Sequence, residues 1–290
     1  MRINTNVSSL TAQEAAKNTN NNITSSLEKL STGLRINKAS DDASGLAIAD
    51  KLRTEASGLN QAISNGNAAI TLTQIADKAM AEQSNILDVV KQKLIQAGTA
   101  TTSAEGIDAI SKDVQKLLDQ VNNIAAQTNY NGTYLLQSSA GSTSSAAQLT
   151  FQMGTTSADT IMTGSGVASN VSGLDGLLAV YTAASGWSAG GSGAVMQSAA
   201  RLLLANVDSA LTELNGWRAD FGSTQNQLES SVRNLMTQVT NIKAAESVIR
   251  DVDYAQESAN FNKQNIIAQA GTYAISQANA VSQNVMRLLQ

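Results

Sequence analysis

The chain of 290 residues has no cysteine, no histidine and no proline, and aromatic residues make up only 3% of it. Without Cys there is no disulfide, no cysteine-ligated zinc and no thiol nucleophile. Without His the commonest general base and metal ligand are missing. The lack of Pro suits long uninterrupted helices, because an interior Pro costs a helix about 3 kcal/mol. We therefore expect no enzyme activity, no cofactor and no metal site.

Charge and hydropathy exclude two further classes of partner. The chain holds 19 Lys and Arg against 23 Asp and Glu, a net charge of −4, without a basic cluster. Proteins that bind phosphate backbones need a basic face, so we expect no nucleic-acid binding. The chain has no run of about 18 apolar residues, so we expect no helix that spans a membrane. The first residues, Met1–Asn6, lack the apolar region of a Sec signal peptide, so any export would need another machine.

Composition divides the chain into two helical arms and a middle. Residues 1–137 and 196–290 show helical periodicity, whereas Ser138–Gln197 holds ten of the twenty glycines and no Lys or Arg. Within this middle, Gln148–Met153 alternates with period two and predicts a strand. Just before it, Asn131-Gly132 predicts a hairpin, because both residues tolerate the positive φ of a type I′ turn. We expect the middle to consist mostly of short strands and loops.

Apolar residues in both arms are spaced alternately by three and four. This spacing is typical of helices packed side by side at shallow angles. Ordinary amphipathic helices in one globule would explain one such stripe, but a bundle better explains five. The stripes run over 23–34, 52–70, 107–124, 204–242 and 267–288. The sequence therefore predicts a mainly α fold of long coiled-coil or bundled helices.

Polar segments separate these helices. Residues 35–45 and Thr101–Ser103 are non-periodic, and Ser40, Asp41 or Asp42 is suited to cap the helix that follows. The pairs Asp41-Asp42 and Asp251/Asp253 could suggest a metal or acid–base site. Without a histidine nearby, we instead expect ion pairs with the neighbouring basic residues Arg35, Lys38 and Arg250.

The two terminal stripes need a partner, because an isolated helix rich in Asn and Ser is marginally stable. That partner is either the other terminus, completing a monomeric bundle, or another molecule on which the ends become ordered. We favour assembly and predict a seam formed by Ile3, Val7, Leu10, Ile23, Leu27, Leu30, Leu34, Ile267, Ala274, Ala278, Val281, Val285 and Leu288.

Both ends of the chain resemble bacterial flagellin. The resemblance lies in residues 3–6 (INTN), 26–37 (SLEKLSTGLRIN) and 41–48 (DDASGLAI) at the N-terminal end. At the other end it lies in 251–255 (DVDYA), 267–272 (IAQAGT), 276–279 (SQAN) and 283–285 (QNV). It extends over roughly the first 137 and last 95 residues. One departure is Ser282, where the family often has Pro.

The resemblance implies a fold built from both chain ends. Residues 1–35 and 253–290 would pair as a terminal coiled coil, D0, joined through spoke linkers at 36–44 and 246–252. Residues 45–137 and 197–245 would form a helical bundle with a β-hairpin, D1. Residues 138–196 would form a small outer domain, mostly of strands and loops.

The same resemblance implies assembly into a secreted, extracellular bacterial flagellum that drives swimming motility. The partners would be further copies of the chain, the flagellar type III export apparatus, an export chaperone on the C-terminal helix, and the filament cap and hook–filament junction proteins. A hook–filament junction protein or a secreted adhesin is the alternative, although each would match the terminal signatures less well. Some flagellins carry an inserted zinc protease. That enzyme requires a His-Glu-x-x-His helix, and this chain has no His.

Many flagellins carry a Gln-Arg-Val-Arg-Glu-Leu-Ala segment that the innate immune receptor Toll-like receptor 5 binds. The corresponding residues are Asp88, Val89, Val90, Lys91, Gln92, Lys93 and Leu94. Val89 replaces the first Arg and removes its guanidinium, and Lys91 is not equivalent to the second Arg. We expect weak activation of the receptor, as in the branch of the family that evades it. The alternative is drift without immune pressure.

The hydroxyl-rich middle also resembles glycosylated outer regions of that branch. Candidate O-glycosylation sites are Ser142, Thr143, Ser144, Thr155, Thr156, Ser169, Ser185 and Ser188. Composition alone equally fits an unmodified, solvated surface.

Overall fold

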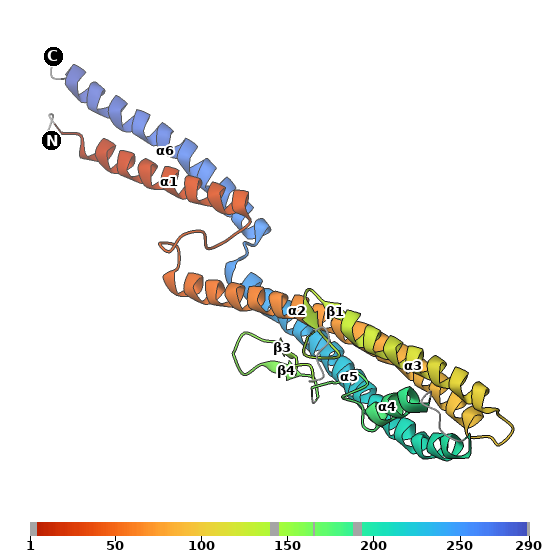
Figure 1. Ribbon diagram of the computed structural model, residues 1–290. Helices are drawn as coiled ribbons and strands as arrows, with labels where there is room; N and C mark the ends of the chain where they lie inside the picture. The colour runs from red at the N-terminus through yellow and green to blue at the C-terminus, as the bar shows by residue number, and fades with distance from the viewer. Residues whose placement is uncertain (1–4, 140–144, 165, 188–192, 289–290) are drawn as a thin grey trace. The chain divides into compact units, whose positions relative to one another are not determined.

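The computed structural model describes residues 5–139, 145–164, 166–187 and 193–288. These residues form two compact units: a terminal unit, residues 1–57 with 238–290, and a helical unit, residues 58–237 (Figure 1). The described helices are α1 (Val7–Thr32), α2 (Ala43–Ala97), α3 (Ala104–Gln127), α4 (Leu177–Trp187), α5 (Gly193–Arg250) and α6 (Tyr254–Leu288). The prediction of a mainly α fold is confirmed.

In the terminal unit α1 and α6 lie side by side and antiparallel, and we call them the terminal pair (Figure 1). At one end the Asn6 side-chain amide donates to the Ala278 carbonyl at 3.0 Å. At the other end, Gly33 ends α1 in the left-handed region with φ +74°, and its N–H donates to the Lys29 carbonyl. A non-glycine residue is strained at that φ, so Gly33 is well suited to stop the helix.

The connectors between the terminal pair and the long helices differ from the expected linkers. Residues 33–42 are non-helical, as the polar sequence predicts, and the Asp42 carboxylate caps α2 by accepting from the Gly45 N–H at 2.9 Å. On the other side, however, α5 continues through Arg250, so the expected linker at 246–252 is helical over most of its length. No Gly or Pro interrupts residues 246–250. Only residues 251–253 separate α5 from α6.

The core of the helical unit is formed by large aliphatic side chains of α2, α3 and α5. Leu87, Leu118 and Leu214 are completely buried there. Ser103 caps α3 through a hydrogen bond from the Gly106 N–H, which confirms the predicted break before this helix. Beside the core, β1 (Asn129–Tyr130) and β2 (Thr133–Tyr134) form the predicted hairpin. Its turn has φ +50° at Asn131 and +82° at Gly132.

The middle of the chain is more closely integrated than we expected. The predicted strand is present as β3 (Thr150–Gln152), antiparallel to β4 (Thr160–Met162). The segment also contains the helix α4, and Val171, Leu174 and Val180 pack in the same hydrophobic cluster as α2, α3 and α5. The described part of residues 138–196 therefore belongs to the helical unit rather than to a compact domain of its own. Its apolar side chains complete a core that the long helices leave open.

Candidate assembly surface

The contact between α1 and α6 is made mainly by small and polar side chains, with the larger Ile23, Leu30, Phe261 and Ile275 only partly buried. On α1 the buried residues are Ser9, Thr19 and Ser26, which are ten and seven residues apart. Ala12 and Ala16 are partly buried between the first two. Gly271 of α6 lies opposite Ala16, where an added Cβ would be 4.0 Å from the alanine Cβ. Small residues at these positions let the two backbones approach closely. The terminal pair thus has an inner face that buries little apolar surface.

Several large apolar side chains of the terminal pair are exposed rather than packed between the two helices. Tyr273 is 74% exposed and Val7 is 63% exposed. We define the outer face by its exposed large apolar residues: Val7, Leu10, Leu27, Ile266, Ile267, Tyr273 and Val281. Exposed apolar residues that form a contiguous patch are typical of protein association sites.

The predicted seam divides between these two faces. Ile23, Leu30, Leu34 and Ala278 are partly buried, whereas Val7, Leu10, Leu27, Ile267, Ala274 and Val281 are exposed. Ile3 lies outside the described residues, as do the side chains of Val285 and Leu288. On α6 the sequence spacing predicted that the more apolar stripe would be packed, whereas Ala268 and Gly271 are the residues partly buried against α1.

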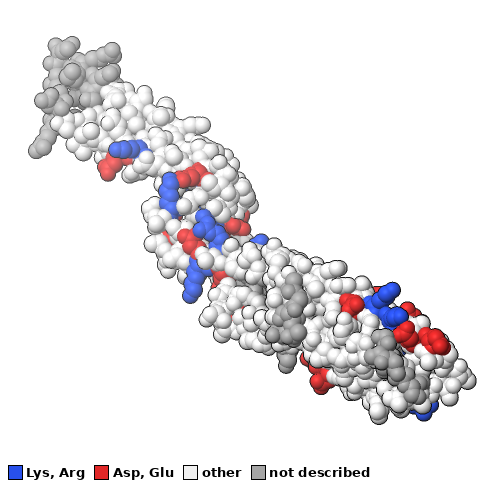
Figure 2. Space-filling model, viewed as in Figure 1, with Lys and Arg blue, Asp and Glu red and all other residues white. Residues whose placement is uncertain are grey.

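One stretch of the terminal pair is free of charged side chains. Residues 5–13 and 264–281 contain no Lys, Arg, Asp or Glu. In Figure 2 the described atoms of this stretch are white, and charged side chains appear farther along the pair toward the connectors. Polar neutral side chains, chiefly Asn, Gln and Ser, surround the apolar residues. A second copy can therefore approach this face without like-charge repulsion.

The connector carboxylates act as caps, which corrects the ion pairs we predicted for them. Asp41 accepts from the backbone N–H groups of Asn37 and Lys38, each at 3.0 Å. These hydrogen bonds, from Lys38 first and Asn37 second, lower the pKa of Asp41 below its usual value. Asp253 likewise caps α6 by accepting from the Ala255 N–H at 2.9 Å. Each carboxylate satisfies backbone donors that a helix start or turn leaves unpaired.

The basic residues of the connector find other partners. Lys38 pairs with Glu28 at 2.7 Å, and this hydrogen bond raises the pKa of the lysine. Arg250 lies 4.0 Å from both Asp50 and Glu246. Over the described ranges, no group of three or more acidic side chains is arranged to hold a metal ion.

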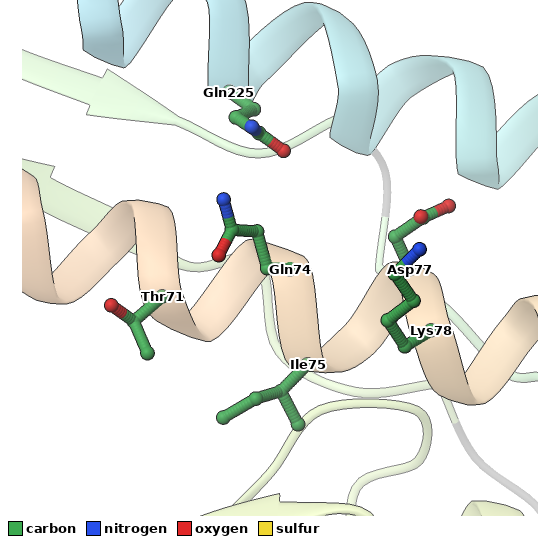
Figure 3. Close-up of a pocket in the computed structure, with 6 residues that line it drawn as sticks. All are labelled: Thr71, Gln74, Ile75, Asp77, Lys78 and Gln225. Atoms are coloured by element: carbon green, nitrogen blue, oxygen red, sulfur yellow. The ribbon is translucent and has the colours of Figure 1, made fainter.

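A groove in the helical unit offers no reactive group. It has a volume of about 670 Å³ and is lined by Thr71, Gln74, Ile75, Asp77, Lys78 and Gln225. Figure 3 shows Gln74 of α2 and Gln225 of α5 pointing toward one another across it. Asp77 is engaged by Arg218 at 3.0 Å. Amides and a paired carboxylate supply hydrogen bonds but no nucleophile with an adjacent base.

The segment corresponding to the receptor-binding motif is only partly accessible. Val90 and Leu94 are completely buried, whereas Asp88, Val89 and Gln92 are exposed. The two lysines face other helices: Lys91 is paired with Asp208 and Lys93 with Asp113.

The candidate glycosylation sites differ widely in accessibility. Thr155, Thr156 and Ser185 are exposed. The Thr156 hydroxyl donates a hydrogen bond to the Asp159 carboxylate at 2.6 Å. Ser169 is completely buried, so its hydroxyl cannot be reached in the folded chain. Ser142, Thr143, Ser144 and Ser188 lie outside the described residues.

Comparison with known proteins identifies the family. Residues 3–141 match the bacterial flagellin N-terminal helical region, and residues 204–289 match the bacterial flagellin C-terminal helical region. The chain belongs to the bacterial flagellin family. It is 34% identical to a flagellin of Bacillus subtilis and 33% identical to the flagellar filament 33 kDa core protein of Treponema phagedenis, in each case over the full length of both chains.

This flagellin is a structural subunit of the bacterial flagellar filament, which serves motility, and not an enzyme. Its fold also resembles that of a putative flagellar hook-associated protein from Vibrio parahaemolyticus, with a TM-score of 0.62. That similarity covers 72% of this chain and 99% of the other at 11% identity, so it concerns the fold alone. Among the described helices, none is both long and apolar enough to cross a membrane.

Proposed function

We propose that this flagellin polymerises through the outer face of its terminal pair. The observation that carries the proposal is the division of side chains in that pair: small residues lie between α1 and α6, while Leu10, Ile267 and Tyr273 lie outside. Burying exposed Leu, Ile or Tyr side chains stabilises a contact by about 1.5–3 kcal/mol each. Contacts between different patches on successive copies generate a helical polymer.

Seeded polymerisation of the purified chain, followed by electron microscopy, tests this proposal. We expect the full chain to extend filament seeds, and a variant lacking residues 1–35 and 254–290 to stay monomeric. Continued growth of the truncated variant would contradict the proposal. A full-length chain that remains a protease-resistant monomer with seeds present would instead support a self-contained bundle, as in the junction-protein or adhesin alternative.

Point variants separate the outer face from the helix pair itself. Ile267→Gln and Leu10→Gln place polar groups where the outer face is exposed, so the monomer should keep its helicity while growth slows strongly. Gln277→Ala, at an exposed polar position of α6, is the matched control and should grow normally. Equal growth rates for all three variants would exclude the outer face as the polymerisation surface.

We further propose that the same face of α6 is covered before assembly by an export chaperone. The subunit would leave the cell unfolded through the flagellar type III apparatus, and would assemble extracellularly beneath the filament cap, beyond the hook–filament junction proteins. The exposed Ile267, Tyr273 and Val281 support this, because they need cover in water. Calorimetric titration of the export chaperone should give weaker binding to Ile267→Gln than to Gln277→Ala. Equal affinities would exclude this face.

We propose weak activation of Toll-like receptor 5. Val89 offers no guanidinium, and the charges of Lys91 and Lys93 are already paired within the chain. In a reporter-cell assay, Val89→Arg should increase the response, whereas Gln92→Ala should not. A parent chain as potent as an enteric flagellin would contradict the proposal.

We propose that O-glycosylation, if the producing cell performs it, uses Thr155, Thr156 or Ser185, whose positions are exposed. The intact mass of filament protein should then exceed the sequence mass, and a Thr155→Ala, Thr156→Ala, Ser185→Ala variant should lose the excess. A mass equal to that of the sequence would exclude modification.

A further inference from the structure

The inner face of the terminal pair carries little information about alignment. Many of its positions are small, such as Ala12 and Ala16 of α1 and Ala268 and Gly271 of α6. Its large apolar residues are only partly buried: Ile23, Leu30, Phe261 and Ile275. If α6 slid along α1 by one heptad, Ala16 would leave Gly271 and meet Ala278, another small residue. Large apolar side chains that fit specific gaps normally fix such alignments. Here no described large apolar side chain of the pair is fully buried, so a more specific contact elsewhere would fix the alignment better.

A set of hydrogen bonds joins the two helices where they begin and end. The Val252 N–H donates to the Gly33 carbonyl at 3.0 Å, and the Arg35 N–H donates to the Arg250 carbonyl at 2.7 Å. Between these bonds, Leu34 and Asp251 form an antiparallel bridge. We call residues 33–35 with 249–252 the clasp.

Side chains reinforce the clasp. The Arg35 guanidinium donates to the Ile249 carbonyl at 2.6 Å, which satisfies an acceptor in the last turn of α5. The Tyr254 hydroxyl lies 3.0 Å from the point where a Cβ on Gly33 would be. Gly33 therefore ends α1, accepts from Val252 just before α6 and leaves room for Tyr254, the first side chain of α6.

We propose that the clasp sets the register of α1 against α6. The connector leaves no free residue on the α1 side of the clasp, because α1 ends at Thr32 and the bonded segment begins at Gly33. On the α6 side, only Asp253 separates Val252 from the helix. Fixing Gly33 against Val252 thus fixes every later pair along the antiparallel helices. The outer face depends on this alignment, because its residues come from both helices.

Cysteine cross-linking tests the register directly, since the natural chain has no cysteine. In the variant Ala16→Cys, Gly271→Cys the two Cβ atoms would lie 4.0 Å apart, within the range of about 3.5–4.5 Å that a disulfide requires. The variant Ala16→Cys, Ala278→Cys reports a register slipped by one heptad, about 10 Å along α6. In the otherwise natural chain, under a glutathione redox buffer, we expect the first pair to form a disulfide and the second not to.

Each cysteine pair is then combined with a change in the clasp. Val252→Pro removes the N–H that donates to Gly33, and Val252→Ala keeps it as the matched control. Gly33→Ala places a Cβ against the Tyr254 hydroxyl at a strained φ; Gly216→Ala, in an open position of α5, is its control. We expect Val252→Pro and Gly33→Ala to reduce the ratio of native to slipped disulfide by about tenfold, and the controls to leave it unchanged.

Two results would overturn the proposal. One is an unchanged disulfide ratio in both Val252→Pro and Gly33→Ala, which would show that the inner face sets its own register. The other is equal cross-linking of the two cysteine pairs in the natural background, which would show that no register exists in the isolated chain. The helicity and the thermal unfolding of the full chain, measured in parallel, check that the clasp variants still fold.

Discussion

The helical unit and the terminal pair use the same heptad spacing for different purposes. In the helical unit the spaced positions are large and completely buried, as with Leu87, Leu118 and Leu214. In the terminal pair the fully buried described positions are small and polar, as with Ser9 and Thr19, and large residues such as Leu10 and Tyr273 are exposed. Periodicity therefore predicts a helix in both regions. The size of the inward side chains determines how much apolar surface that helix buries within one chain.

The largest expected effect compares one leucine from each region. Leu118→Ala removes a completely buried side chain from the helical core, so it should lower the free energy of unfolding by about 2–5 kcal/mol. Leu10→Ala, in the terminal pair, removes an exposed side chain and should change it by less than about 0.5 kcal/mol. Urea denaturation measures both. A Leu10→Ala loss as large as that of Leu118→Ala would show that the outer face is buried within the single chain.

Two glycine substitutions compare the packing of the same regions. A Cβ on Gly66 would lie 2.6 Å from a Val232 methyl and 2.7 Å from the Met153 methyl, so Gly66→Ala should destabilise the helical unit by about 1–3 kcal/mol. A Cβ on Gly271 would meet only the Ala16 Cβ at 4.0 Å, so Gly271→Ala should stabilise α6 by about 0.5–1 kcal/mol.

Thermal unfolding followed by circular dichroism measures both glycine variants. Gly216→Ala is the control for the gain in helix propensity, because nothing lies within 4 Å of its Cβ position. Destabilisation of α6 by Gly271→Ala would mean that the terminal pair packs more tightly than the Ala16 contact indicates.

Local signals in the sequence predicted much of the fold. The absence of Pro and the spacing of Ile and Leu predicted the long helices, Asn131-Gly132 predicted its hairpin, and Asp42 was among the predicted caps. The signature residues at both ends predicted the family. These features depend on short-range backbone preferences, which a sequence displays directly.

Other features depend on contacts between distant segments. The apolar run of α4, Leu177–Val180, fits either a short strand or a buried helix by its pattern alone, and the core it completes decides the outcome. On α6, the spacing of Ile267 and Val281 indicated the packed face, but Gly271 occupies it because a glycine allows closer approach. The buried Ser169 could not be distinguished by composition from exposed hydroxyls.

A smaller effect concerns how the middle segment is attached to the helical unit. The completely buried Gln83 amide donates to the Val121 carbonyl at 3.0 Å and to the Ser169 carbonyl at 2.7 Å. Gln83→Met keeps the shape and loses both bonds, so it should destabilise the unit by about 1–2 kcal/mol. Hydrogen exchange should show earlier opening around Ser169 and Val171, and the exposed Asn85→Ala is the control. Unchanged exchange at Ser169 would show that apolar packing alone holds the segment.

The smallest effect is expected from pH, and it should act on the connector rather than on either helix contact. The chain has no His, so the terminal unit should be equally stable from about pH 8 to pH 5.

The pKa of Asp41 is lowered in the folded state by the Lys38 and Asn37 N–H groups. Its contribution is therefore present above the ordinary aspartate pKa of about 3.9 and is lost as the pH falls through the lower folded-state value. The protection factors of the Asn37 and Lys38 amides should fall only in that acidic range, and Asp41→Ala should lower them throughout the range above it. Because residues 5–13 and 264–281 carry no charge, protection within the terminal pair should not follow the same acidic transition. A simultaneous loss of protection in both places would show that the connector carboxylate also holds the two helices together.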